Sequence, residues 1–256
     1  LEELISASTG AGYEALELII TDDGLVNLSS TDADLAAVSG AVSASGLEIA
    51  SVCPAFSGAP KDLMTADDSV RATSLGTVKR CLDIAAGLGT DTVLLTLGSL
   101  PASLCYSEAY ANALQSVQRL APYAESKGVN LAIEYVWNWF LLSPMEFARF
   151  CDECASPRIG FYFDPGNMTI FGHAEHWARI CGRYIQKVHM KDFGRDGARW
   201  PPLLEGATLV IVYTHSLAPT TTIKIFNGAA ATGAHGNAWQ LHLNVPGVNA
   251  IRYTGL

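Results

Sequence analysis

Three short apolar runs in the second half of the sequence each end in a side chain that can bind a divalent metal. Glu134, Asp164 and His189 close these runs, at intervals of 30 and 25 residues. Each interval is about the length of one strand–helix–strand unit. Two carboxylates and one imidazole offer the donors that Mn²⁺ or Mg²⁺ accepts. One polar residue at the end of an apolar run is usually ordinary loop chemistry, but three at matched spacing favour a single metal site.

Such a site requires that the three runs are parallel strands whose carboxyl ends meet at one rim, where α/β barrels carry their chemistry. Apolar runs of strand length alternate along the chain with stretches of helical spacing, which is typical of a parallel sheet covered by helices. The predicted strands are Ala15–Ile20, Leu47–Cys53, Thr92–Leu97, Leu131–Tyr135, Ile159–Phe163 and Ile185–His189.

Helices are predicted between these strands from apolar stripes and end signals. Gly128 is a natural C-terminal cap for a helix over Glu108–Lys127, and Asp67–Gly87 has the same helical spacing. Ser143, followed by Pro144 and Glu146, predicts a capping box at the start of a further helix. A helical pattern also covers residues 1–12, so we expect no strand before it.

Composition limits the classes of protein to consider. The 256 residues suit one eight-stranded α/β barrel, and the net charge of −9 offers no basic footprint for nucleic acid. Despite a mean hydropathy of +0.22, no membrane-spanning run or signal peptide is visible. The six cysteines include one pair, Cys151 and Cys154, in a helical pattern, which favours reduced thiols over a redox or metal site. We therefore expect a cytoplasmic protein without nucleic-acid or membrane partners, and a homo-oligomer remains open.

The composition changes after Glu205. Residues 206–256 contain no Asp or Glu and only Lys224 and Arg252 as charged residues. We divide the chain into a (β/α) barrel domain over 1–205 that lacks its first strand, and a divergent β-rich tail over 206–256. This tail is packed on the gap in the barrel, forms an added module, or is not native to the fold. Its β-like runs are Leu209–Thr214, Thr221–Phe226, Trp239–Val245 and Ala250–Thr254.

The sequence around the three candidate ligands has a fairly specific pattern. It consists of Ala132-Ile-Glu134, Ser143-Pro-Met-Glu146, Asp164-Pro-Gly-Asn167 and His189-Met-Lys-Asp192. This pattern resembles the sugar phosphate isomerase/epimerase family of xylose isomerase-like (AP endonuclease family 2) TIM barrels, and within it the ketose 3-epimerases. The resemblance implies a TIM-type (β/α)8 barrel in which Glu134, Asp164 and His189 hold one divalent ion, with Mn²⁺ or Mg²⁺ expected. The substrate would be a small ketose or ketose phosphate.

The resemblance also implies a reaction and roles for further residues. The metal grips two substrate oxygens while a base removes the proton beside the carbonyl, which gives an enediolate, and a second carboxylate returns a proton to the opposite face. Glu134 would be one of the two catalytic carboxylates. Asn167 and Arg195 would contact the substrate. Lys191 would also contact it or form a strand-end ion pair, and Trp137 would wall the sugar pocket or cap the barrel.

The sequence departs from the family pattern at its fourth ligand, an acid expected near positions 224–229. These positions read Lys-Ile-Phe-Asn-Gly-Ala. Glu205 is either a substitute ligand or a loop residue. With the first strand also missing, we expect six parallel strands in one curved open sheet and weak or absent epimerase activity. The alternatives are a non-catalytic remnant of the family and a polyol dehydratase on the same fold.

Overall fold

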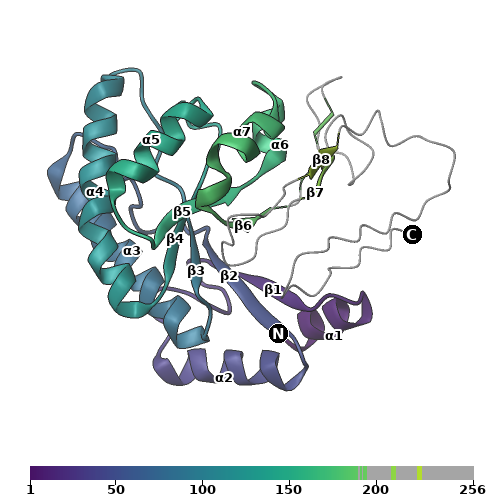
Figure 1. Cartoon of the computed structure of the whole chain (residues 1–256). Helices are drawn as coiled ribbons and strands as arrows, with labels where there is room; N and C mark the ends of the chain where they lie inside the picture. The colour runs from purple at the N-terminus through teal and green to yellow at the C-terminus, as the bar shows by residue number, and fades with distance from the viewer. Residues whose placement is uncertain (190, 192, 195–208, 212–223, 227–256) are drawn as a thin grey trace, which may run out of the picture.

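A computed structural model of the chain describes residues 1–189, 191, 193–194, 209–211 and 224–226. Six parallel strands form one sheet in which spatial order follows chain order (Figure 1). They match the six predicted strands to within two residues at either end. Their bounds are β1 Ala15–Ile20, β2 Glu48–Pro54, β3 Thr92–Leu95, β4 Asn130–Glu134, β5 Ile159–Phe163 and β6 Ile185–Val188.

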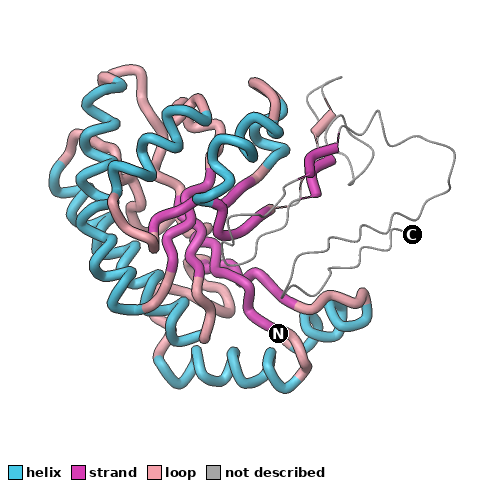
Figure 2. The backbone as a smooth tube through the Cα atoms, in the orientation of Figure 1, coloured by secondary structure: helices cyan, strands magenta, loops and turns pink. Residues whose placement is uncertain are grey.

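Helices follow the strands and cover the outer side of the sheet (Figure 2). This arrangement is that of repeated strand–helix units, as the alternation in the sequence predicts. The helices are α1 Glu2–Gly10, α2 Asp32–Ala44, α3 Asp68–Leu88, α4 Tyr106–Lys127, α5 Pro144–Cys154, α6 Pro165–Thr169 and α7 Ala174–Cys181, followed by the 3-10 turn η1 Gly182–Tyr184.

Local signals set the helix ends. Gly128 ends α4 with a φ of 67°, a left-handed conformation that glycine adopts without a steric cost. At the start of α5, the Ser143 hydroxyl accepts a hydrogen bond from the backbone N–H of Glu146. The Glu146 carboxylate accepts from the N–H of Leu142 rather than from that of Ser143. The predicted capping box is therefore half present, with its return bond shifted by one residue.

The two faces of the sheet carry different side chains because alternate residues of a strand point to opposite sides. The outer face joins the helices in a large apolar core, where the rings of Phe147 and Phe161 lie 4.2 Å apart between centroids. A small separate cluster of Leu94, Ala132 and Tyr162 lies on the other face. Glu134, two residues after Ala132, and Asp164, two residues after Tyr162 and just past the end of β5, therefore point to the inner side of the sheet.

The sheet is curved enough for its two edges to meet through side chains. Glu17 on β1 and His189, which follows β6, are at opposite edges, yet Glu17 Oε1 lies 2.9 Å from His189 Nε2. A closed barrel of this type has eight parallel strands, and the described residues supply six. The predicted incomplete barrel is thus confirmed.

The tail contributes two short strands within the described residues. β7 Leu209–Ile211 and β8 Lys224–Phe226 pair antiparallel with each other in a separate two-stranded sheet. Both fall within predicted β-like runs, whereas the runs over 239–245 and 250–254 lie outside the described residues. So does the junction between 205 and 206, and the division into barrel and tail stays a prediction.

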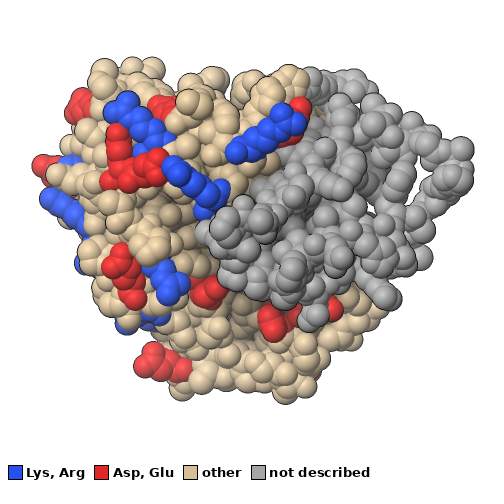
Figure 3. All heavy atoms as spheres, in the orientation of Figure 1, with Lys and Arg blue, Asp and Glu red and all other residues tan. Residues whose placement is uncertain are grey.

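Charges and thiols complete the description of the fold. The face drawn in Figure 3 carries acidic and basic side chains interspersed over the helices. Surface pairs such as Arg183 and Asp152, at 2.8 Å, contribute little to stability. All six cysteines are free, including Cys151 and Cys154 on the buried side of α5. Of the described helices, none combines the length and the apolarity that crossing a membrane requires.

Candidate metal centre

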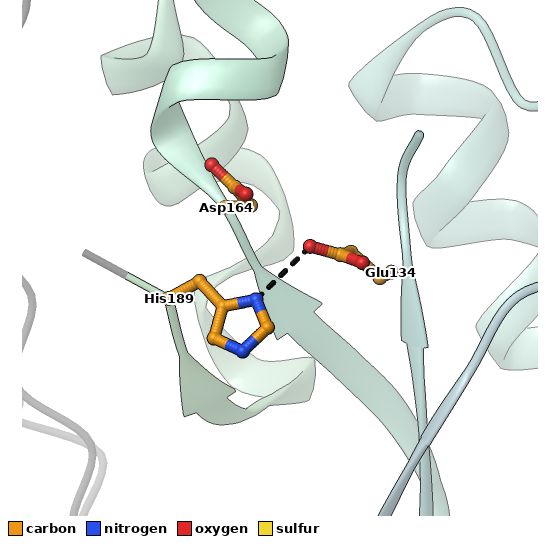
Figure 4. A group of neighbouring side chains, drawn as sticks. All are labelled: Glu134, Asp164 and His189. Carbon is orange, nitrogen blue, oxygen red and sulfur yellow. Dashed lines mark hydrogen bonds and ion pairs between the residues drawn. The ribbon is translucent and has the colours of Figure 1, made fainter. Parts of the chain in front are cut away.

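The three predicted ligands gather at the carboxyl ends of neighbouring strands. Glu134 is the last residue of β4, Asp164 directly follows β5, and His189 directly follows β6. One ligand atom from each lies within 4.8 Å of the others (Figure 4). The structure therefore brings together side chains that are separated by 55 residues of sequence, in a geometry that could hold a metal ion.

The Asp164-Pro-Gly-Asn167 turn shapes one side of this group. Asp164 is the N-terminal cap of α6, and its Oδ1 accepts a hydrogen bond of 3.2 Å from the backbone N–H of Asn167. Pro165 takes the first helical position, where its missing N–H costs nothing. A Cβ at Gly166 would lie 3.1 Å from Lys191 Cβ, so glycine permits the close approach of these two segments.

Polar side chains link the three ligands to one another. Lys191 Nζ lies 2.8 Å from Asp164 Oδ2 and donates to Asn167 Oδ1 at 3.2 Å. The Asn167 amide donates to the backbone oxygen of Tyr135 at 2.9 Å and lies 3.5 Å from Glu134 Oε1. The indole N–H of Trp137 donates to the Asn167 backbone oxygen at 3.0 Å.

The candidate substrate-binding residues thus divide into two groups. Asn167, Lys191 and Trp137 all belong to the network around the three ligands. Arg195 and the alternative ligand Glu205 lie outside the described residues. Lys191 forms an ion pair with Asp164, which places its charge at the ligands themselves.

His189 lies between two carboxylates. Its Nδ1 is 3.1 Å from Glu134 Oε1, and its Nε2 is 2.9 Å from Glu17 Oε1. The imidazole also packs on the ring of Tyr162, with 4.3 Å between centroids. Burial alone would lower the pKa of His189, but the hydrogen bonds to Glu134 and Glu17 and their charges raise it to about 10.

The two glutamates on either side of the imidazole have opposite pKa shifts. Burial, together with the charge of Asp164, raises the pKa of Glu134 above its ordinary value despite the hydrogen bond to His189. Burial also opposes ionisation of Glu17, but hydrogen bonds from His189, Ser51 and Tyr162 hold its pKa below the ordinary value. Glu17 is therefore the more firmly ionised of the two.

Glu17, Ser51 and Tyr162 are the site residues that the sequence reasoning missed. All three lie inside apolar strands, where Glu17 is the one charged residue of β1 and Ser51 is fully buried. Glu17 has an apolar residue on each side within β1. This pattern was a usable signal of a buried site residue, because a buried charge requires partners. Its partners, however, are 34 to 172 residues away in sequence.

The residues present fit a divalent cation. The Asp164 side chain is fully buried and that of Glu134 is only 9% exposed, so two carboxylates crowd a region of low water access. The Lys191 ammonium lies against one carboxylate, and the His189 ring, whose pKa is raised, lies against the other. Two crowded carboxylates favour a cation between them, and the oxygen and imidazole donors suit Mn²⁺ or Mg²⁺ better than a thiolate-seeking ion.

Comparison with known proteins identifies similar chains. The family described as xylose isomerase-like TIM barrel matches residues 5–217. An L-ribulose 3-epimerase from Methylomonas sp. (strain DH-1) is 25% identical over 174 residues, which are 65% of this chain and 57% of that relative. The match therefore spans little more than half of the relative's length.

Two solved structures share the fold. D-psicose 3-epimerase, determined in the presence of D-fructose, superposes with a TM-score of 0.66 at 21% identity and covers 78% of this chain and 69% of its own. D-allulose 3-epimerase from Methylomonas sp., in complex with D-allulose, gives a TM-score of 0.62 at 23% identity and covers 73% of this chain and 65% of its own.

Proposed function

Because the chain belongs to the xylose isomerase-like TIM barrel family, we propose that it is a metal-dependent epimerase or isomerase acting on a ketose or ketose phosphate. The observation that carries the proposal is the convergence of Glu134, Asp164 and His189 at three adjacent strand ends. The relatives named above are 3-epimerases of ketoses, which supports this substrate class.

Glu134, Asp164 and His189 would hold the ion. When bound, a divalent cation supplies Lewis-acid stabilisation of the negative charge that develops on the substrate oxygens. Lys191, whose ammonium lies 2.8 Å from Asp164 Oδ2, would add a further positive charge at the same carboxylate. Asn167, held by Asp164 and Tyr135, stays in place at the rim of the site.

Glu134 is the proposed base for the carbon acid. Removal of a proton beside a carbonyl is most effective when the pKa of the base approaches the operating pH. Burial and the neighbouring Asp164 carboxylate shift the pKa of Glu134 in that direction. This shift belongs to the metal-free protein, and a bound cation would lower the pKa again, so the proposed role of base depends on the position of Glu134 in the metal group.

The proposed sugar-binding surface includes one exposed aromatic ring. The Trp137 residue is 43% exposed although its indole N–H is used by the Asn167 backbone oxygen. Its ring face can pack against sugar C–H groups, and Phe193 supports it edge-on at 6.1 Å. Arg195, six residues after His189, stays a proposed substrate contact.

Turnover is proposed to be slow. Inversion of a carbon centre needs a second proton donor on the face opposite Glu134, and among the described residues the metal group has three members rather than four. Glu17 does not complete it, because Glu17 contacts the Nε2 side of His189 while Glu134 contacts the Nδ1 side. A non-catalytic remnant of the family is the alternative that the same incomplete group favours.

Two measurements on one preparation separate these functions. Mn²⁺ binding is measured by titration, and proton exchange at C3 of D-fructose, D-allulose and L-ribulose is followed by NMR in D₂O with Mn²⁺ present. The proposal predicts saturable binding and slow exchange above buffer, both lost in Glu134→Gln. Binding without exchange, or neither, supports the remnant. Rapid turnover would contradict the proposed lack of a second proton donor.

A further inference from the structure

Glu17 lies on the side of His189 that faces away from the metal group, and both of its carboxylate oxygens have hydrogen-bond partners. Its Oε2 accepts hydrogen bonds of 2.7 Å from both the Ser51 hydroxyl and the Tyr162 hydroxyl. Its Oε1 lies 2.9 Å from His189 Nε2. Ser51 and Tyr162 are almost fully buried, so little water competes for these bonds.

A count of protons determines the form of the imidazole. Ser51 and Tyr162 have one hydroxyl proton each, and both hydroxyls donate to Glu17 Oε2 at 2.7 Å, which is shorter than the 3.1 Å between the two hydroxyl oxygens. An ionised carboxylate only accepts hydrogen bonds, so Glu17 Oε1 requires a proton on His189 Nε2. In the neutral imidazole, the lone pair then lies on Nδ1, which is the nitrogen that faces Glu134 at 3.1 Å.

We propose that Glu17, supported by Ser51 and Tyr162, is a positioning residue that holds His189 with its Nδ1 lone pair directed at the metal group. This inference rests on the proposed metal centre and adds a residue to it. Metal-binding histidines depend on such an outer partner for tautomer and ring orientation. Tyr162 contributes twice, because its hydroxyl orients Glu17 and its ring packs on the imidazole.

The arrangement also explains why the acid is on β1. Glu17 lies at one edge of the open sheet and His189 at the other. In a curved sheet, inward-pointing side chains from opposite edges meet across the interior. A single carboxylate therefore joins the first strand of the sheet to the last ligand, 172 residues later, and makes the metal group depend on the curvature of the whole sheet.

The test is Mn²⁺ affinity in the full chain, measured by titration calorimetry. Loss of an outer partner of a metal-bound histidine weakens binding about 10- to 100-fold, and we expect this for Glu17→Ala. Glu17→Gln keeps an oxygen that can accept a hydrogen bond from His189 Nε2, so it should bind Mn²⁺ with most of the wild-type affinity. Tyr162→Phe should have a smaller effect. Glu48→Ala, an exposed acid on the neighbouring strand β2, is the matched control and should bind like the wild type.

A spectroscopic readout separates positioning from a general loss of structure. In protein labelled with ¹⁵N-histidine and loaded with Zn²⁺, the His189 signals should report one tautomer protonated at Nε2 in the wild type and in Glu17→Gln. Glu17→Ala should show a mixture, with thermal unfolding of the metal-free variants recorded in parallel. If Glu17→Ala binds like the wild type while Asp164→Ala does not bind, the inference is wrong and the metal centre stands. If the wild type binds no Mn²⁺, both fail.

Discussion

Glu17 and Glu134 are the same residue type on two sides of one imidazole ring, and their environments shift their pKa values in opposite directions. Both are largely buried and both contact His189. Glu17 has two additional hydroxyl donors, Ser51 and Tyr162, which lower its pKa. Glu134 faces the Asp164 carboxylate, and its further contact within the described part of the chain is a long one of 3.5 Å from the Asn167 amide.

Burial alone does not decide the charge of a carboxyl group in this site. A carboxylate that accepts several hydrogen bonds is stabilised in its charged form, whereas one beside a like charge is destabilised. When the environments of two titratable groups shift their pKa values in opposite directions, the two groups are expected to have different roles in a site. The Glu134 carboxylate therefore favours binding of a cation or a proton, whereas the Glu17 carboxylate already has its hydrogen-bond donors.

The largest expected effect comes from removing a direct ligand on the Glu134 side. Asp164→Ala should weaken Mn²⁺ binding by more than about 100-fold, since losing a ligand exceeds losing an outer partner. Asp152→Ala, which removes an exposed acid on α5, should leave the affinity unchanged. Calorimetric titration measures both. Wild-type binding by Asp164→Ala would mean that the buried carboxylate does not face the ion.

The next effect is the dependence of Mn²⁺ affinity on pH. His189 has a pKa raised to about 10 in the metal-free protein, and its Nδ1 proton must leave before the nitrogen can bind a metal. Affinity should therefore rise about tenfold per pH unit from about pH 6.5 to 8.5. In the metal-free protein the sign is reversed. Stabilisation by the charged His189 is complete below its ordinary pKa and is lost as the pH rises toward 10.

A flat affinity profile would show that the imidazole is already neutral at Nδ1. His189→Gln serves as the control, because it removes the titrating group and should bind Mn²⁺ weakly, without this slope. Unfolding by urea in the presence of a chelator measures the stability of the metal-free protein across the same pH range.

Exchanging each glutamate for glutamine tests the comparison most directly. In the metal-free protein at pH 7, Glu17→Gln should lower the free energy of unfolding by about 1.5–3 kcal/mol, the range for hydrogen bonds to a charged group. Glu134→Gln should be neutral or stabilising, because the raised pKa of Glu134 means that its ionised form opposes folding. Urea unfolding measures both, and destabilisation of equal size would remove the distinction between the two sides.

The smallest expected effect is that of Ser51→Ala, which removes one of the two hydroxyl donors to Glu17 Oε2. A cost of about 0.5–1.5 kcal/mol in the free energy of unfolding is typical of one hydrogen bond. Tyr162→Phe should cost a similar amount, since it removes the other donor and keeps the ring. If neither variant changes stability, the hydroxyls do not support the Glu17 carboxylate.

Much of the fold was predictable because its signals are local. The six strands, the stop at Gly128 and the start after Ser143 follow from apolar runs, caps and breakers within a few residues. The exact strand ends were less accessible. Leu97 and Tyr135 continue apolar runs, yet β3 ends at Leu95 and β4 at Glu134, because pairing with a neighbouring strand decides where a strand stops.

The candidate site shows the same division. Glu134, Asp164 and His189 could be identified from their types and spacing, as each ends an apolar run. Glu17 could not be assigned to them, because nothing local relates the middle of β1 to the end of β6. The place of Lys191 in the site is likewise set by the fold, because its ammonium contacts Asp164 and Asn167 at once.

By itself, the sequence determined the order of strands and helices, three strand-end ligands and the family resemblance, because these depend on residue type and short-range spacing. Only the tertiary structure decided that the open sheet curves until β1 reaches His189, and that one glutamate has hydrogen-bond donors while the other faces a like charge. The physical reason is that curvature and pKa depend on contacts between side chains up to 172 residues apart, which no local pattern of the sequence contains.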